Sequence, residues 1–210
     1  MSALKPRQRG VAVVEFTLSS VVLIPLLLGT MVFGFRLIRA IEMQTITRDL
    51  GHMYLEQINF RNSGPQQNAQ TLASGFNLTA TGTSLVVLEQ VKLEQQADCD
   101  AGNPMSPLGT PCPNLNKTVF IEQLTIGNTS DGASHFGTPP FAPSPPAAKT
   151  YTVSAADQAN NPAALANNFS SVMTLKAGEI AYVVEMINLT PDLNIPGFSG
   201  TPQVYARSVF

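Results

Sequence analysis

The chain has 210 residues, a formal net charge of −2 and a charged fraction of only 12%. This length accommodates one domain and an anchor, but hardly two full domains. With so few basic residues the chain has no cationic face to neutralise phosphates. Nucleic acid is therefore not an expected partner.

A basic leader precedes a long apolar stretch at the N-terminus. Residues 1–10 carry three basic side chains and no acid, and the twenty residues 16–35 carry no charge. A helix of this length crosses a hydrocarbon core of roughly 30 Å. The stretch is longer than the apolar part of a cleaved signal peptide, and no small-residue cleavage site follows Phe35. We therefore expect a transmembrane helix over residues 11–35.

The helical period continues beyond the expected span. Four apolar side chains recur on one face at spacings of three, four and three residues: Met43, Ile46, Leu50 and Met53. Such a stripe is typical of a helix that packs one side on a core. The pattern predicts a single helix from about residue 11 to about residue 58, with residues 36–60 as an extension outside the membrane.

Basic residues orient the span by a narrow margin. Three precede it, and Arg36, Arg39 and Arg48 follow it. The short leader without acids and the cysteine pair described below favour an N-terminus inside. The expected topology is a single pass through the cytoplasmic membrane, with an extracytoplasmic C-terminal domain.

Pro25 lies within the expected span. It has no backbone N–H, which leaves the carbonyl of Val21 without its helical partner. In lipid this carbonyl needs another donor, so we expect a kink or local melting, relieved by Ser20 or Thr17. Proline is also common in membrane helices without any special role.

The two cysteines, Cys99 and Cys112, enclose the segment DAGNPMSPLGTP. A disulfide in an oxidising compartment is one interpretation of so close a pair, and two unpaired surface thiols are the other. Two thiols without a nearby histidine cannot complete a tetrahedral zinc site, so no metal or cofactor is expected.

Glu15 places a carboxylate at the head of the apolar stretch. At the centre of a bilayer this charge costs about 2.5–3.5 kcal/mol. Near the end of the span it can reach the headgroups, and the positive end of the helix dipole favours an anion. One interpretation is therefore an acid tolerated at the interface.

The distance from Gly10 to Glu15 suggests a second interpretation. Cleavage after Gly10 would make Val11 the first residue, with an α-amino pKa of about 8. In a bundle of such helices, Glu15 could pair with a neighbour's ammonium group. At an effective dielectric of 20 and a separation of 4 Å the attraction is about 4 kcal/mol. Slipping the helices would leave two buried charges unpaired, so the pair would define their register.

The string RGVAVVEFTLSSVVLIPLLLGTMVFGFR, residues 9–36, resembles the N-terminus of TadE-like minor pilins (pseudopilins) of the tight-adherence (Tad) pilus, which have a type IV pilin-like start. The resemblance implies cleavage between Gly10 and Val11 by a prepilin peptidase. It also implies that Glu15 and Phe16 act in assembly.

The implied partners are the prepilin peptidase, other pilins and Tad assembly proteins, reached through the N-terminal helix, and the lipid bilayer. The implied location is the bacterial inner membrane, with incorporation in a surface pilus as a further option. The sequence departs from the family pattern at Val32, where a second acid is frequent, and at Phe35, which is inserted before Arg36. The role of that second acid cannot be carried over.

Beyond residue 60 the pattern changes to one typical of strands. Four stretches are rich in Val, Ile and aromatic residues: 83–95, 117–128, 178–189 and 202–210. Alternation gives the third an expected core face: Ile180, Tyr182, Val184 and Met186. The second has an expected core face interrupted by Glu122: Phe120, Leu124 and Ile126.

Short helices and a proline-rich loop complete the expected domain, residues 61–210. A helix is expected to start at Ser63 or Gly64 and another over residues 161–173, introduced by Pro162. Residues 128–149 are expected to form an exposed loop. The predicted fold class is α+β: a long N-terminal helix that carries a small antiparallel sheet.

Catalytic patterns are weak. Asp131, Ser134 and His135 are neighbours in one glycine-rich loop, which rarely holds the geometry of a catalytic triad, and no phosphate loop or HExxH motif occurs. We expect no enzymatic activity.

The leading hypothesis is a membrane-anchored minor pilin or pseudopilin that acts in assembly of a Tad-type pilus. The alternative is an extracytoplasmic binding or adhesive domain on a simple membrane tether.

Overall fold

The structure is a computed structural model that describes residues 6–139, 150–190 and 203–210. The chain divides into two compact units, Met1–Arg39 and Ala40–Phe210. Helix α1, Pro6–Leu55, begins in the first unit and ends in the second. The observed architecture is α+β, as predicted.

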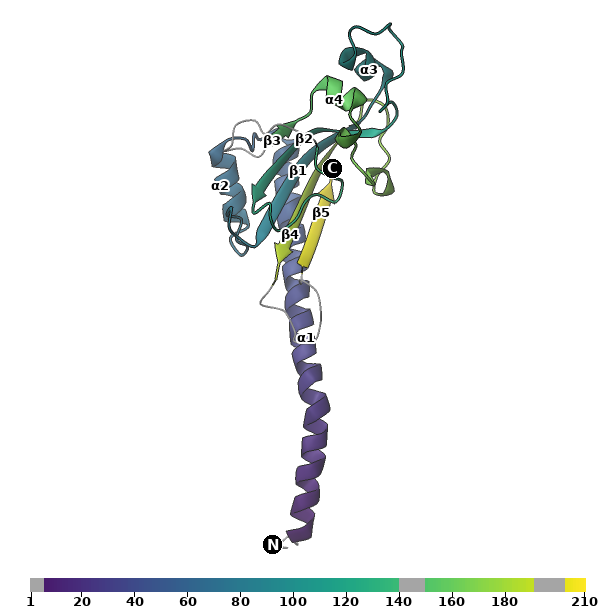
Figure 1. Ribbon diagram of the computed structural model, residues 1–210. Coiled ribbons are helices and arrows are strands. Elements are labelled where there is room, and N and C mark those ends of the chain that lie inside the picture. Colours follow the sequence, from purple (N-terminus) through teal and green to yellow (C-terminus); the bar gives the residue numbers. More distant parts are fainter. Residues whose placement is uncertain (1–5, 140–149, 191–202) are drawn as a thin grey trace. The chain divides into compact units, whose positions relative to one another are not determined.

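The second unit is built on an antiparallel sheet of five described strands in the order β3-β2-β1-β4-β5 (Figure 1). The strands are β1 (Ser84–Leu93), β2 (Thr118–Gly127), β3 (Thr150–Thr152), β4 (Ile180–Leu189) and β5 (Gln203–Val209). The four predicted strands are confirmed within a few residues at each end. The short edge strand β3 was not predicted from the sequence.

Short helices flank the sheet. They are α2 (Ser63–Leu72), α3 (Gln96–Gly102), α4 (Ala155–Asn160) and two 3₁₀ turns, η1 (Pro162–Ala164) and η2 (Phe169–Ser171). The start of α2 agrees with the prediction. The single helix predicted over 161–173 is wrong, because the chain forms two separate 3₁₀ turns there. Helices α3 and α4 pack together at one end of the sheet (Figure 1).

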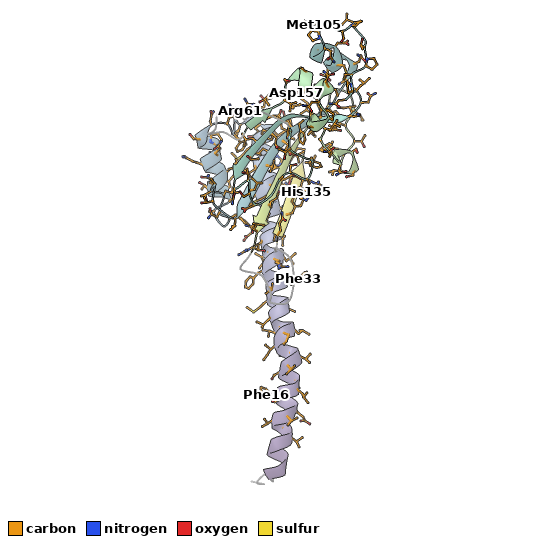
Figure 2. All side chains as sticks on the ribbon, in the orientation of Figure 1. Phe16, Phe33, Arg61, Met105, His135 and Asp157 are labelled. Atoms are coloured by element: carbon orange, nitrogen blue, oxygen red, sulfur yellow. A yellow bond between two sulfur atoms is a disulfide. The ribbon has the colours of Figure 1, made fainter. Side chains whose placement is uncertain are left out.

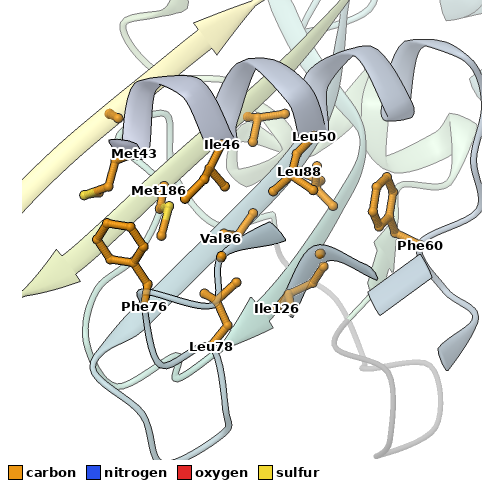
Figure 3. Close-up of a cluster of buried hydrophobic side chains, with 14 of the residues drawn as sticks. Met43, Ile46, Leu50, Phe60, Phe76, Leu78, Val86, Leu88, Ile126 and Met186 are labelled. Carbon is orange, nitrogen blue, oxygen red and sulfur yellow. The ribbon is translucent and has the colours of Figure 1, made fainter. Parts of the chain in front are cut away.

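The C-terminal part of α1 packs on one face of the sheet. Met43 and Leu50 are fully buried and Ile46 nearly so, and Met53 packs against the same cluster. Met43, Ile46 and Leu50 point towards Val86, Leu88 and Met186 of the sheet (Figure 3). The predicted stripe is therefore confirmed. Each such side chain contributes about 1.5–3 kcal/mol when it leaves water.

A polar contact supplements this packing at the edge strand β5. Thr47 is fully buried on α1, and its hydroxyl lies 3.1 Å from that of Ser208. The Gln44 amide donates to the carbonyl of Arg207 at 3.1 Å. These contacts tie the helix to the last strand.

A second core covers the opposite face of the sheet. Its members come from the strands and from segments before and after β3: Val91, Phe120, Phe136, Val153, Ala164, Ala166, Phe169, Leu175, Ala181 and Val183. Because both faces are covered, the inner strands carry apolar residues on both faces. The exposure expected for residues 128–149 is confirmed only in part over 128–139. Thr129, Ser130, Ala133, His135 and Thr138 are exposed, but Pro139 is buried and Phe136 is 1% exposed. Residues 140–149 lie outside the described residues.

A β-bulge separates residues that the sequence places on one face. Gln90 pairs with Glu122, but Val91 pairs with Phe120, so Ile121 is the extra residue on β2. Phe120 therefore packs in the second core, while Leu124 and Ile126 pack under α1. The predicted shared face is wrong because a bulge interrupts the two-residue period. On β4, Val184 and Met186 are buried as predicted, but Ile180 is 48% exposed.

The helix-to-sheet packing can be tested with two leucines of α1. Leu50→Ala should lower the free energy of unfolding by about 2–5 kcal/mol, because it leaves a cavity in the core. Leu55→Ala is the matched control, since Leu55 is 45% exposed, and it should change stability by no more than about 0.5 kcal/mol. Urea unfolding of the full chain in detergent measures both. Equal losses for the two variants would contradict this packing.

Candidate functional site

The N-terminal part of α1 exposes its apolar side chains all round. From Val11 to Leu28 every side chain except that of Ser20 is exposed, and Phe16 is 74% exposed (Figure 2). Among the described residues this is the one helix long and apolar enough to cross a membrane. A surface of this kind is unstable in water and requires lipid or other apolar helices around it.

The residues predicted to act in processing and assembly lie at the head of this helix. Gly10 and Val11 are consecutive helical residues, since α1 starts at Pro6. Glu15 is exposed and has neither a hydrogen bond nor an ion pair with any residue that the structure describes. Its carboxylate is therefore open to an external partner.

Helix α1 continues without a break through Pro25. The local melting that the sequence allows is therefore absent. The Thr17 hydroxyl donates to the carbonyl of Val13 at 2.8 Å, and that of Thr30 donates to the carbonyl of Leu27 at 2.8 Å. Hydroxyls bonded to their own helix are satisfied without water, as a lipid environment requires.

Cys99 and Cys112 form a disulfide, with Cα atoms 5.3 Å apart. Glu94 lies beside them, and its carboxylate and the two sulfurs lie within 4.8 Å of one another. Sulfurs joined in a disulfide are not thiolates, so these three groups cannot act together as metal ligands in this state. Asp98, which the sequence places next to Cys99, pairs with Lys92 at 2.7 Å and caps the first turn of α3.

A buried pair of acids lies under the second core. Glu89 on β1 and Glu185 on β4 are both 0% exposed. Glu89 accepts a hydrogen bond of 2.7 Å from the Gln123 amide, while its second oxygen has no partner among the described residues. Glu185 accepts from the Tyr205 hydroxyl and, at 3.0 Å, from the backbone N–H of His135.

Burial dominates the electrostatics of this pair. Desolvation, assisted by the nearby Glu185, raises the pKa of Glu89 to about 8. Burial and the bond to Glu185 also raise the pKa of Tyr205. Glu89 is therefore protonated and neutral at pH 7. The pair then avoids two negative charges side by side in the core.

This acid pair was not predicted from the sequence, because only one face of each strand was expected to be buried. The available signal was the apolar run on both sides of each glutamate, in SLVVLEQVKL and IAYVVEMINL, which indicates a strand buried on both faces. The neighbouring loop residues form no triad. Ser134 accepts from the N–H of Phe136, Asp131 accepts from Asn128, and the His135 ring stacks near Tyr205.

Comparison with protein-family models, with curated proteins and with solved structures finds no match for the chain.

The raised pKa of Glu89 makes stability depend on pH. Between about pH 4.5 and about pH 8 the folded chain holds a proton that the unfolded chain releases. The free energy of unfolding should therefore fall as pH rises through this window, by at most about 1.4 kcal/mol per pH unit for this group. Glu89→Gln should remove this component of the slope. The measurement is denaturant unfolding of the full chain at several pH values.

Glu56→Gln is the matched control for this experiment, because Glu56 is exposed. It should retain the pH slope of the unmodified chain. If Glu89→Gln and the unmodified chain showed the same slope, the raised pKa of Glu89 would be wrong.

Proposed function

We propose that the chain is a membrane-anchored minor pilin or pseudopilin that acts in assembly of a Tad-type, type IV-like pilus. The observation that carries the proposal is the spacing of Gly10 and Glu15 at the head of an apolar helix that nothing covers in the described structure. A simple tether needs the apolar helix, but it needs neither the glycine nor the glutamate.

Two environments cover the apolar surface of the helix, one after the other. Before assembly, lipid covers the side chains of residues 11–35. In a pilus, equivalent helices of neighbouring subunits cover them. Both environments are apolar, so the helix can pass from one to the other without exposing its side chains to water.

The register of the bundle follows from the helix geometry. Val11 and Glu15 are four residues apart, which is about 6 Å along a helix axis. A Glu15 carboxylate therefore meets the amino group of a neighbour when the two helices are offset by about one turn. Glu15 is exposed and unpaired with described residues, so it is free to make this contact.

The processing step is tested by substitution of Gly10. We expect the mature protein from a host with a prepilin peptidase to begin at Val11, and Gly10→Phe to block this cleavage. Gly29→Phe is the control, because nothing lies within 4 Å of a Cβ atom added at Gly29. Intact-mass spectrometry reads both results. A mature chain that begins at Met1 in such a host would support the simple tether instead.

The assembly step is tested by substitution of Glu15. Glu15→Ala should leave insertion and cleavage unchanged, because the alanine strengthens the apolar stretch. If about 1–2 kcal/mol of the ion pair survives desolvation, each helix contact weakens by about 5- to 30-fold, and the pilus yield falls. Glu42→Ala removes an exposed glutamate beyond the apolar stretch and should keep the yield. Equal pilus yields from Glu15→Ala and the unmodified chain would exclude the register role.

A further inference from the structure

A cleft of about 430 Å³ lies where α1 ends on the sheet. Its size is within the range of small-molecule sites. One wall is the turn after α1, residues 57–61, and the other is formed by side chains of β1, β2 and β4. Gln57 has a φ of 61°, in the left-handed region that costs a non-glycine residue about 1–2 kcal/mol. The turn adopts this conformation and carries Asn59 and Arg61 to the rim of the cleft.

The floor of the cleft is a row of polar side chains. The strand register places Glu122, Gln90 and Tyr182 side by side on β2, β1 and β4. The row before it, Leu124, Leu88 and Val184, is apolar and buried. Helix α1 therefore covers the apolar row, and the polar row faces the cleft.

The Tyr54 hydroxyl is the least satisfied group in the cleft. Tyr54 is 6% exposed, and its ring packs against Tyr182, with ring centres 5.3 Å apart. The hydroxyl makes no hydrogen bond of good geometry with any described residue. The Gln90 side chain lies near enough to lower the pKa of Tyr54, but burial outweighs this effect. Burial raises the pKa of Tyr54, so the hydroxyl keeps its proton and can donate. An unpaired buried hydroxyl costs about 1–3 kcal/mol, which a bound acceptor would recover.

The charges at the rim neutralise each other. The Arg61 guanidinium contacts the Glu122 carboxylate through two nitrogens, at 3.2 Å and 3.0 Å. A charged ligand would lose its hydration in the cleft without gaining a free opposite charge, because Arg61 and Glu122 already neutralise each other. A neutral polar ligand does not have this desolvation cost. The cleft therefore favours a neutral ligand.

The strands below the cleft exclude recognition of a peptide backbone by strand addition. β1 and β4 each have a strand along both sides, and β3 pairs with β2 at Glu122, Gln123 and Leu124, so the strands are paired on both sides below the cleft. Strand addition needs a free edge. On the side of the strands a ligand therefore meets side chains: the Tyr182 ring, the Gln90 amide and the Glu122 carboxylate.

We propose that this cleft binds a neutral sugar. A sugar ring has apolar C–H faces, which pack on the partly exposed ring of Tyr182, behind which the buried rings of Tyr54 and Phe60 lie. Its hydroxyls both donate and accept, as the Gln90 amide, the Glu122 carboxylate and the Tyr54 hydroxyl require. The site lies within the unit Ala40–Phe210, so it depends neither on cleavage nor on pilus assembly.

The test uses the full chain in a detergent without a sugar head group, since such a head group would compete for the site. The probes are glucose, galactose, mannose, N-acetylglucosamine and N-acetylgalactosamine at millimolar concentration, and saturation-transfer NMR detects binding. We expect at least one sugar to bind. Tyr54→Phe removes only the hydroxyl and should weaken that binding by about tenfold, and Gln90→Ala by at least as much.

Gln67→Ala is the matched control, because Gln67 is exposed on α2 outside the cleft, and it should bind as the unmodified chain does. Circular dichroism verifies that each variant is folded. Failure of all five sugars to bind would overturn the proposal. So would sugar binding that Gln90→Ala leaves unchanged, or binding of a neutral tripeptide in place of every sugar.

Discussion

The packing of the stripe Met43, Ile46 and Leu50 on the sheet is the interaction on which the second unit depends. It buries one face of β1, β2 and β4 under the C-terminal part of α1. The stripe begins close to the boundary between the two units, at Arg39 and Ala40. Over residues 16–35 α1 carries no charge and is apolar all round, and C-terminal to the boundary the helix is apolar on one side. One helix therefore presents an apolar surface all round in its N-terminal part and a single buried stripe in its C-terminal part, because the distribution of its apolar residues changes along its length.

The other face of the sheet has a different character, because it encloses polar groups. Glu89, Gln123 and Glu185 are buried there beside an apolar cluster. Such groups contribute little net stability, since their desolvation offsets their hydrogen bonds. They do specify position: Gln123 donates to the carbonyl of Gly137, and Glu185 accepts from the backbone of His135. The acid network thus ties residues 135–137 to the sheet.

Local patterns in the sequence were sufficient for the long elements and the start of α2, but not for the other short elements or for every buried face. The helical stripe, the four long strands and the start of α2 each depend on neighbouring residues, and all were predicted. The bulge at Ile121 was not, because the two-residue period of a strand contains no sign of an inserted residue. The second core, the acid pair and the cleft depend on contacts between residues far apart in the chain. The spacing of Gly10 and Glu15, in contrast, is local and visible in the sequence alone.

The difference between apolar and charged side chains in an apolar environment explains how the single carboxylate of Glu15 could set the register of an assembly. Apolar side chains of α1 gain little when they exchange lipid for the side chains of another helix, because both surroundings exclude water. Apolar contacts alone therefore do not select one axial offset between two such helices. A charge changes its energy strongly with its surroundings, since at low dielectric it needs a partner. Within residues 11–35, Glu15 is the one ionisable side chain. A partner for Glu15 is therefore the contact that can distinguish one register of the proposed bundle from the others.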